Sequence, residues 1–109
     1  MKTSIQEQII TIANHYGYEV QSRQLIEEMA ELMVAINKYH RADKSDAITA
    51  KEYLDIEYLK RNISEEIADV EIMLAQIKYL LGCTNMEIEH NKEQKIMRQL
   101  TRIKEESWQ

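Results

Sequence analysis

The chain contains no proline, and its 109 residues include only two glycines, Gly17 and Gly82. Proline and glycine are the residues that most often interrupt helices, so long helices can run freely except at these two positions. A single cysteine, Cys83, excludes an internal disulfide framework. The remaining composition is rich in Glu, Lys, Gln, Ile, Leu, Met and Ala, which favours helix throughout.

Long apolar runs and an excess of basic charge are also missing. No stretch approaches the ~20 uncharged apolar residues of a membrane span, and the N-terminus lacks the apolar core of a signal peptide. With 19 acidic against 14 basic residues, the net charge is −5. Non-specific duplex binding usually needs a basic surface. We therefore expect a cytoplasmic protein with neither a nucleic acid nor a membrane as its partner.

We expect one domain spanning residues 1–109, in which helix caps mark where the helices begin. Ser4, Thr49 and Thr84 are each followed three residues later by Glu, which is typical of a capping box. Asn62 can cap a further helix, and both glycines stand where helices should end. The predicted helices span about 4–16, 21–40, 49–60, 63–82 and 84–106. The stretch "RADKSDAI" at 41–48 is typical of a polar loop. We predict an all-α bundle of four to five helices.

Two stretches, "QLIEEMAEL" at 24–32 and "NISEEIADV" at 62–70, are similar when superposed at an offset of 38 residues. In each, apolar residues recur at helical spacing and should form one buried stripe. The paired positions are Leu25 with Ile63, Met29 with Ile67, Leu32 with Val70, and Ile36 with Leu74. Glu28 and Glu66 are then expected on the flank of the stripe, with Glu31 and Asp69 one step further round, and Glu27 and Glu65 toward solvent.

If the two stripes pack together, Glu28, Glu31, Glu66 and Asp69 can line one groove. Carboxylates that converge in a partly desolvated groove repel one another or take up protons. Mg²⁺ and Mn²⁺ prefer oxygen ligands and bridge to phosphates, so they would relieve this repulsion. A magnesium site for a phosphorylated substrate is one interpretation. The alternative is that these acids belong to solvated helix faces.

The pair "EEMAE" and "EEIAD" resembles the E-x-x-E…E-x-x-D signature of the MazG and dimeric dUTPase superfamily of all-α nucleotide pyrophosphohydrolases. The resemblance covers roughly residues 15–40 and 62–105 and is closest to the small single-domain members. It implies that Glu28, Glu31, Glu66 and Asp69 are the catalytic Mg²⁺ ligands. It further implies hydrolysis of nucleoside triphosphates to the monophosphate and pyrophosphate by a metal-activated water. The sequence departs from the family in a longer spacing between the motifs, with a loop or short-helix insert at about 41–61.

Substrate contacts are expected from two further places. Lys95, Arg98 and Arg102 share one face of the last predicted helix, with Asn91 on the same side, and such a row can grip phosphates. The alternative is a solvated face paired with nearby glutamates. Gln21, before the first acidic motif, can read a base edge, although it can equally belong to a plain helix start.

The modest core, together with apolar residues outside the stripes, predicts a homodimer or homotetramer. Two other functions remain open. One is a non-catalytic helical interaction or regulatory module. The other is a carboxylate-bridged di-iron bundle, which is less favoured because such a bundle needs two E-x-x-H motifs and the chain has only Glu87-x-x-His90.

Overall fold

The computed structural model describes residues 3–42 and 49–107, and all its regular structure is helical. Helix α1 spans Ile5–Ala42, α2 spans Ala50–Leu81 and α3 spans Asn85–Ser107. No strand occurs in these two ranges, so the all-α class is confirmed. The predicted polar loop at 41–48 falls largely on residues 43–48, which lie outside the described residues.

Each helix begins at the hydroxyl cap that the sequence predicts. The side chains of Ser4, Thr49 and Thr84 each accept a hydrogen bond of 3.1 Å from the backbone N–H three residues further on. Helix α2 ends at Gly82, whose φ of 69° is in the left-handed region that glycine adopts without strain. These local signals set the start of all three helices and the end of α2.

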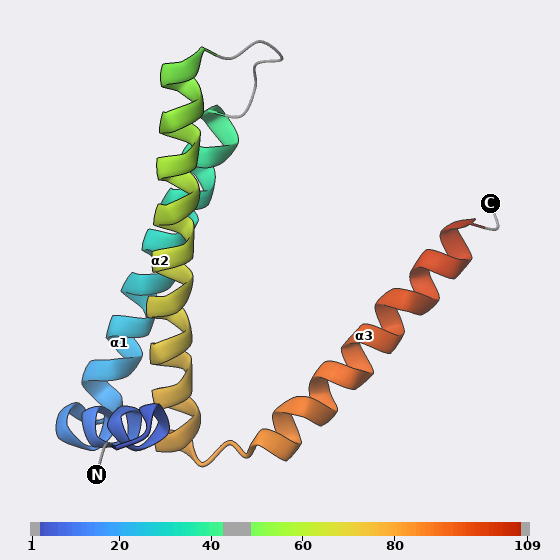
Figure 1. The fold of residues 1–109 in the computed structure, drawn as a ribbon. Coiled ribbons are helices and arrows are strands. Elements are labelled where there is room, and N and C mark those ends of the chain that lie inside the picture. The colour runs from blue at the N-terminus through green and yellow to red at the C-terminus, as the bar shows by residue number, and fades with distance from the viewer. Residues whose placement is uncertain (1–2, 43–48, 108–109) are drawn as a thin grey trace.

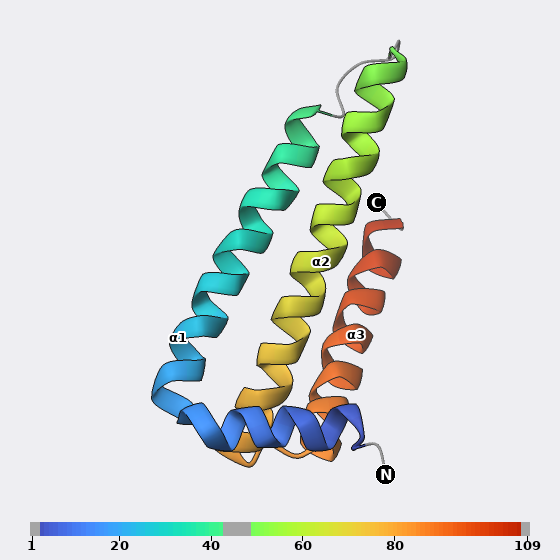
Figure 2. The same cartoon turned by 60° about the vertical axis from the view of Figure 1, so that its left-hand side comes forward.

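Gly17 produces a kink in α1. Its φ of 81° and ψ of 171° break the helical path, and the helix resumes on the other side. Residues 5–16 therefore turn across the lower end of α2, while residues 18–42 rise alongside α2 (Figures 1 and 2). The hydroxyl of Tyr79 donates a 3.1 Å hydrogen bond to Asn14 Oδ1, which ties the turned segment to α2.

The predicted break near Asn62 is wrong, because α2 continues through it without interruption. Asn in a helix interior costs only a few tenths of a kcal/mol relative to good helix formers. Continuous packing along the helix, with Ile56 before this point and Val70 after it both buried, outweighs so small a cost. The expected insert at 41–61 is consequently mostly the first third of α2.

Helices α1 and α2 form an antiparallel hairpin (Figure 1). Their seam contains Gln21, Leu25, Glu28, Leu32 and Ala35 of α1 and Ile63, Glu66, Val70 and Met73 of α2, all buried or half-buried. The alternating steps of three and four residues are those of a coiled coil. Leu25, Val70 and Met73 form the core cluster, with Leu32 and Ile77 packed around it.

Half of the predicted apolar stripe is not in this seam. Met29, Ile36, Ile67 and Leu74 are 40–47% exposed. The seam lies one position before them on each helix, so Glu28 and Glu66 are in the seam and not on its flank. Two sets of positions, one residue apart, fit the pattern of apolar residues on each helix. The set that is buried places the small Ala35 and the hydrogen-bonded Gln21 between α1 and α2.

Helix α3 packs against neither α1 nor α2, and none of its residues is buried (Figure 1). The expected bundle of four to five helices is therefore replaced by a two-helix hairpin and one projecting helix. Among the described helices, none combines the length and the apolar character that a membrane span needs.

Candidate metal centre

Three glutamates meet midway along the hairpin. Glu28 and Glu31 come from α1 and Glu66 comes from α2, and one carboxylate oxygen of each lies within 4.8 Å of the others. Glu28 and Glu31 are three residues apart, which places them side by side on one helix. The antiparallel packing of α1 and α2 then brings Glu66 across the seam to meet them.

The two seam glutamates each have one oxygen without a partner. Gln24 Nε2 donates a 2.8 Å hydrogen bond to Glu28 Oε1. The second oxygens, Oε2 of Glu28 and Oε2 of Glu66, are shielded from solvent and accept no hydrogen bond from the described residues. A buried acceptor without a donor costs about 1–3 kcal/mol, and more if it is charged. Each of these two oxygens is therefore free to accept a hydrogen bond or to contact a cation.

The neighbouring carboxylates change the pKa of the third glutamate, Glu31. The negative charge of Glu28 is the main cause that raises the pKa of the Glu31 carboxyl above its usual range, and Glu66 adds to the effect. Repulsion between carboxylates favours the protonated form of one of them. A bound cation would reverse this preference by attracting all three charges.

The donor set fits a hard divalent cation. One oxygen of each carboxylate lies within 4.8 Å of the others. Around an octahedral Mg²⁺, opposite oxygens are about 4.2 Å apart and neighbouring ones about 3 Å, so small side-chain shifts would let all three contact one ion. Three carboxylates leave further coordination positions for water and phosphate. Asp69 is exposed and lies outside this group of three, so its role as a fourth ligand stays a prediction.

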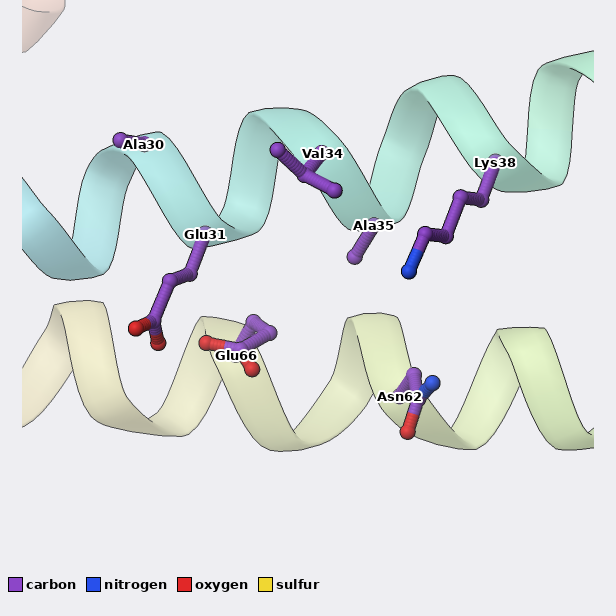
Figure 3. Close-up of a pocket in the computed structure, with 7 residues that line it drawn as sticks. All are labelled: Ala30, Glu31, Val34, Ala35, Lys38, Asn62 and Glu66. Carbon is purple, nitrogen blue, oxygen red and sulfur yellow. The ribbon is translucent and has the colours of Figure 1, made fainter.

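An open groove of about 350 Å³ lies beside the carboxylates on one side of the hairpin. Glu31 and Lys38 of α1 and Asn62 and Glu66 of α2 line it, and the Lys38 side chain extends toward α2 (Figure 3). Sequence reasoning missed Lys38 and Asn62. Their signal was present, because Lys38 follows Glu31 by two helical turns and Asn62 precedes Glu66 by one.

Gln21, which was expected to read a base, is engaged between the helices. It is only 6% exposed, and its Nε2 donates a 2.7 Å hydrogen bond to Oε1 of Gln76, which is 1% exposed. The pair bridges α1 and α2 two turns below Glu28. Gln76 has no signal in the sequence, because its partner appears only in the packed hairpin.

The predicted phosphate contacts Asn91, Lys95 and Arg98 all lie on α3, apart from the hairpin. Lys95, Arg98 and Arg102 do share one face, together with Gln99, along a shallow surface pocket of about 250 Å³. Within one chain the fold does not bring this basic row to the carboxylates.

Comparison with known proteins adds no relative. No protein-family model matches the chain, and neither the curated proteins nor the solved structures that were searched contain a match. The chain is an all-α protein of three described helices without a family assignment. The resemblance to the MazG-type enzymes therefore rests on the sequence itself, on the two acidic motifs, the residues around them and the basic helix that follows.

Proposed function

We propose that the chain is a Mg²⁺-dependent nucleoside triphosphate pyrophosphohydrolase that acts in the cytoplasm as a homo-oligomer. It would convert a ribo- or deoxyribonucleoside triphosphate to the monophosphate and pyrophosphate. One observation carries the proposal. Two shielded carboxylate oxygens without hydrogen-bond donors, from Glu28 and Glu66, lie on facing helices, with Glu31 completing a set that fits a divalent cation.

The three glutamates and two of their neighbours on α1 have distinct roles in this proposal. Glu28, Glu31 and Glu66 hold Mg²⁺, or Mn²⁺, which when bound neutralises phosphate charge and activates a water for attack. Gln24 fixes the Glu28 carboxylate through its 2.8 Å hydrogen bond. Lys38, an exposed cation in the same groove, is placed to pair with phosphate oxygens that the metal leaves free.

The test is an assay of standard and oxidised nucleoside triphosphates with Mg²⁺ or Mn²⁺, analysed for monophosphate and pyrophosphate. Glu28→Gln and Glu66→Gln should abolish product, whereas the neighbouring Glu27→Gln, which removes an exposed charge outside the cluster, should not. Asp69→Asn tests the fourth ligand. Full activity in both seam variants, or no hydrolysis of any nucleotide by the wild type, would overturn the proposal.

A non-catalytic interaction module is the second candidate. The observation that favours it is the exposed apolar surface of α3, including Ile96, Leu100 and Ile103, which are 53–60% exposed. This function predicts that Mg²⁺ changes neither the melting temperature nor nucleotide binding. A melting scan with and without Mg²⁺, set beside the hydrolysis assay, separates the two candidates.

A further inference from the structure

The groove beside the carboxylates has two chemically different ends. One end is lined by Glu31 and Glu66, whose ionised carboxylates only accept hydrogen bonds. The other end is lined by Lys38 of α1 and Asn62 of α2, and an ammonium and an amide can both donate hydrogen bonds. The Lys38 side chain extends across the groove toward α2 (Figure 3). We call this second end the donor end, and its chemistry suits an anion.

The donor end lies directly next to the carboxylates. Lys38 follows Glu31 by seven residues, or about 10 Å along α1, and Asn62 precedes Glu66 by four residues, or about 6 Å along α2. Because α1 and α2 are antiparallel, both steps run in the same direction along the hairpin. A polyphosphate chain with one phosphate at the carboxylates can therefore extend its next phosphates to Lys38 and Asn62.

A second hollow, of about 350 Å³, lies on the same side of α1 beyond the other end of the carboxylate cluster. Its lining residues Val20 and Glu27 each precede a seam position by one, as Glu31 does. The acids Glu19 and Glu27 line it, and the described cation in its lining, Arg23, is paired with Glu19 at 3.7 Å. This hollow repels phosphate more than the donor end does, whereas an uncharged nucleoside is not repelled.

We propose that Lys38 and Asn62 form a subsite for the β- and γ-phosphates of the substrate, which leave together as pyrophosphate. The nucleoside then lies along the second hollow, on the side of Gln24. The inference rests on the proposed function and adds to it the direction of the substrate in the groove. It also names a selected feature of the substrate, because a nucleoside diphosphate has one phosphate fewer to present to the donor end.

The subsite acts on the charge of the leaving group. In the hydrolysis, the oxygen of water bonds to the α-phosphorus, and the bond from that phosphorus to the oxygen bridging to the β-phosphate breaks. Pyrophosphate leaves with the electron pair of the broken bond, and the proton lost by the water passes to solvent. The Lys38 ammonium and the Asn62 amide offset the negative charge on the departing pyrophosphate.

Calorimetric titration of the full chain with Mg²⁺ and inorganic pyrophosphate tests the subsite without hydrolysis. The wild type should bind, and Lys38→Ala should weaken binding about 10- to 100-fold, as loss of a hydrogen bond between charged groups predicts. Asn62→Ala should weaken it several-fold. Lys51→Ala, which removes an exposed charge of α2 outside the groove, is the matched control and should bind like the wild type. Circular dichroism should show equal helicity in all four proteins.

The direction of the substrate is tested with adenosine monophosphate and Mg²⁺, whose binding Lys38→Ala should leave unchanged. The proposal is overturned if Lys38→Ala weakens binding of the monophosphate and spares that of pyrophosphate. It is also overturned if the wild type does not bind pyrophosphate with Mg²⁺, or if Lys38→Ala binds it as tightly as the wild type.

Steady-state kinetics separate this inference from the proposed function. The ratio of kcat/KM for a nucleoside triphosphate to kcat/KM for the diphosphate should fall at least about 10-fold in Lys38→Ala. Hydrolysis with an unchanged ratio would overturn the subsite and leave the hydrolase function standing. A wild type that hydrolyses no nucleotide, yet binds pyrophosphate in a way that depends on Lys38, would overturn the hydrolase function and support the subsite.

Discussion

The α1/α2 hairpin and α3 have the same kind of sequence but very different surroundings. Both are amphipathic, capped and rich in Glu, Lys, Leu and Ile. The hairpin buries Leu25, Val70 and Met73 to 9% exposure or less, whereas every residue of α3 stays at least partly exposed. Isolated helices are marginal in water, and most helical stability in proteins comes from packing an apolar face. An amphipathic pattern thus predicts a helix without predicting its partner.

The same contrast divides the predicted site. The acids of the hairpin are carried by two helices packed against each other, and three of them converge. The basic row of α3 is on a helix that no other described helix touches. Rigid supporting elements hold ligands more precisely than mobile ones, so the hairpin should dominate metal binding and activity.

The largest effect is expected from a substitution that disrupts the metal centre. Glu66→Gln should lower kcat/KM by about a thousandfold or more and abolish Mg²⁺ binding, because it removes the member of the three-glutamate cluster that α2 supplies. Arg98→Ala, on α3, should leave Mg²⁺ affinity unchanged and alter hydrolysis far less. Steady-state kinetics and calorimetric titration of Mg²⁺ measure both effects. Comparable losses in the two variants would show that α3 joins the site.

Core truncation compares the packing of the two regions. Leu25→Ala should lower the free energy of unfolding by about 2–4 kcal/mol, because it leaves a cavity in the core cluster. Leu100→Ala should cost under about 0.5 kcal/mol, as is usual for exposed positions. Urea unfolding followed by circular dichroism gives both values. A Leu100→Ala cost as large as that of Leu25→Ala would mean that α3 is packed in solution.

The buried amide pair gives a smaller effect. Gln76→Leu should cost about 1–3 kcal/mol, because it leaves the buried Gln21 amide without its acceptor. The double variant Gln21→Leu with Gln76→Leu should recover most of this loss, since no buried polar group is then left unpaired. Gln99→Leu, exposed on α3, is the control. Urea unfolding of the four proteins forms the test, and a double variant no more stable than Gln76→Leu would contradict the pairing.

The smallest expected effect is electrostatic. Folding raises the pKa of Glu31, so the folded state holds this proton more tightly than the unfolded state. With EDTA present, stability should therefore fall as the pH rises from the unfolded pKa through the folded one. Glu31→Gln should flatten this dependence and raise the melting temperature at neutral pH, whereas Glu105→Gln on α3 should not. Melting scans across mildly acidic pH measure this dependence. If the change of melting temperature with pH is the same in Glu31→Gln as in the wild type, Glu31 is not its cause.

Local features were predictable from sequence. The three hydroxyl caps and the end of α2 at Gly82 each depend on a few neighbouring residues, and each is confirmed. At Gly17 the sequence predicts the end of a helix, whereas the structure shows a kink within α1. The expected break at Asn62 failed because packing along α2 outweighs a weak local preference. The prediction of the buried apolar stripe was half right, because two sets of helix positions, shifted by one residue, both fit the pattern of apolar residues.

This shift of one residue determines whether Glu28 and Glu66 lie between the helices or beside them. Glu28, Glu31 and Glu66 were recognisable as candidates from their spacing, yet only the observed seam puts Glu28 and Glu66 between the helices. Asp69, matched to Glu31 in the repeated motif, lies outside the group. Gln24 and Lys38 were identifiable by their distance from the acids along α1, but their contacts depend on the position of α2.

By itself, the sequence determined the helical class, the helix limits set by caps and glycines, and the acidic residues available for a site. Only the tertiary structure decided which face of each helix is buried, which carboxylates meet, that Gln21 pairs with Gln76, and that α3 stands apart. The reason is the distance along the chain over which each kind of interaction acts. Caps and spacings act within a turn or two of helix, whereas the phase and partner of a helix depend on long-range packing between residues far apart in the chain.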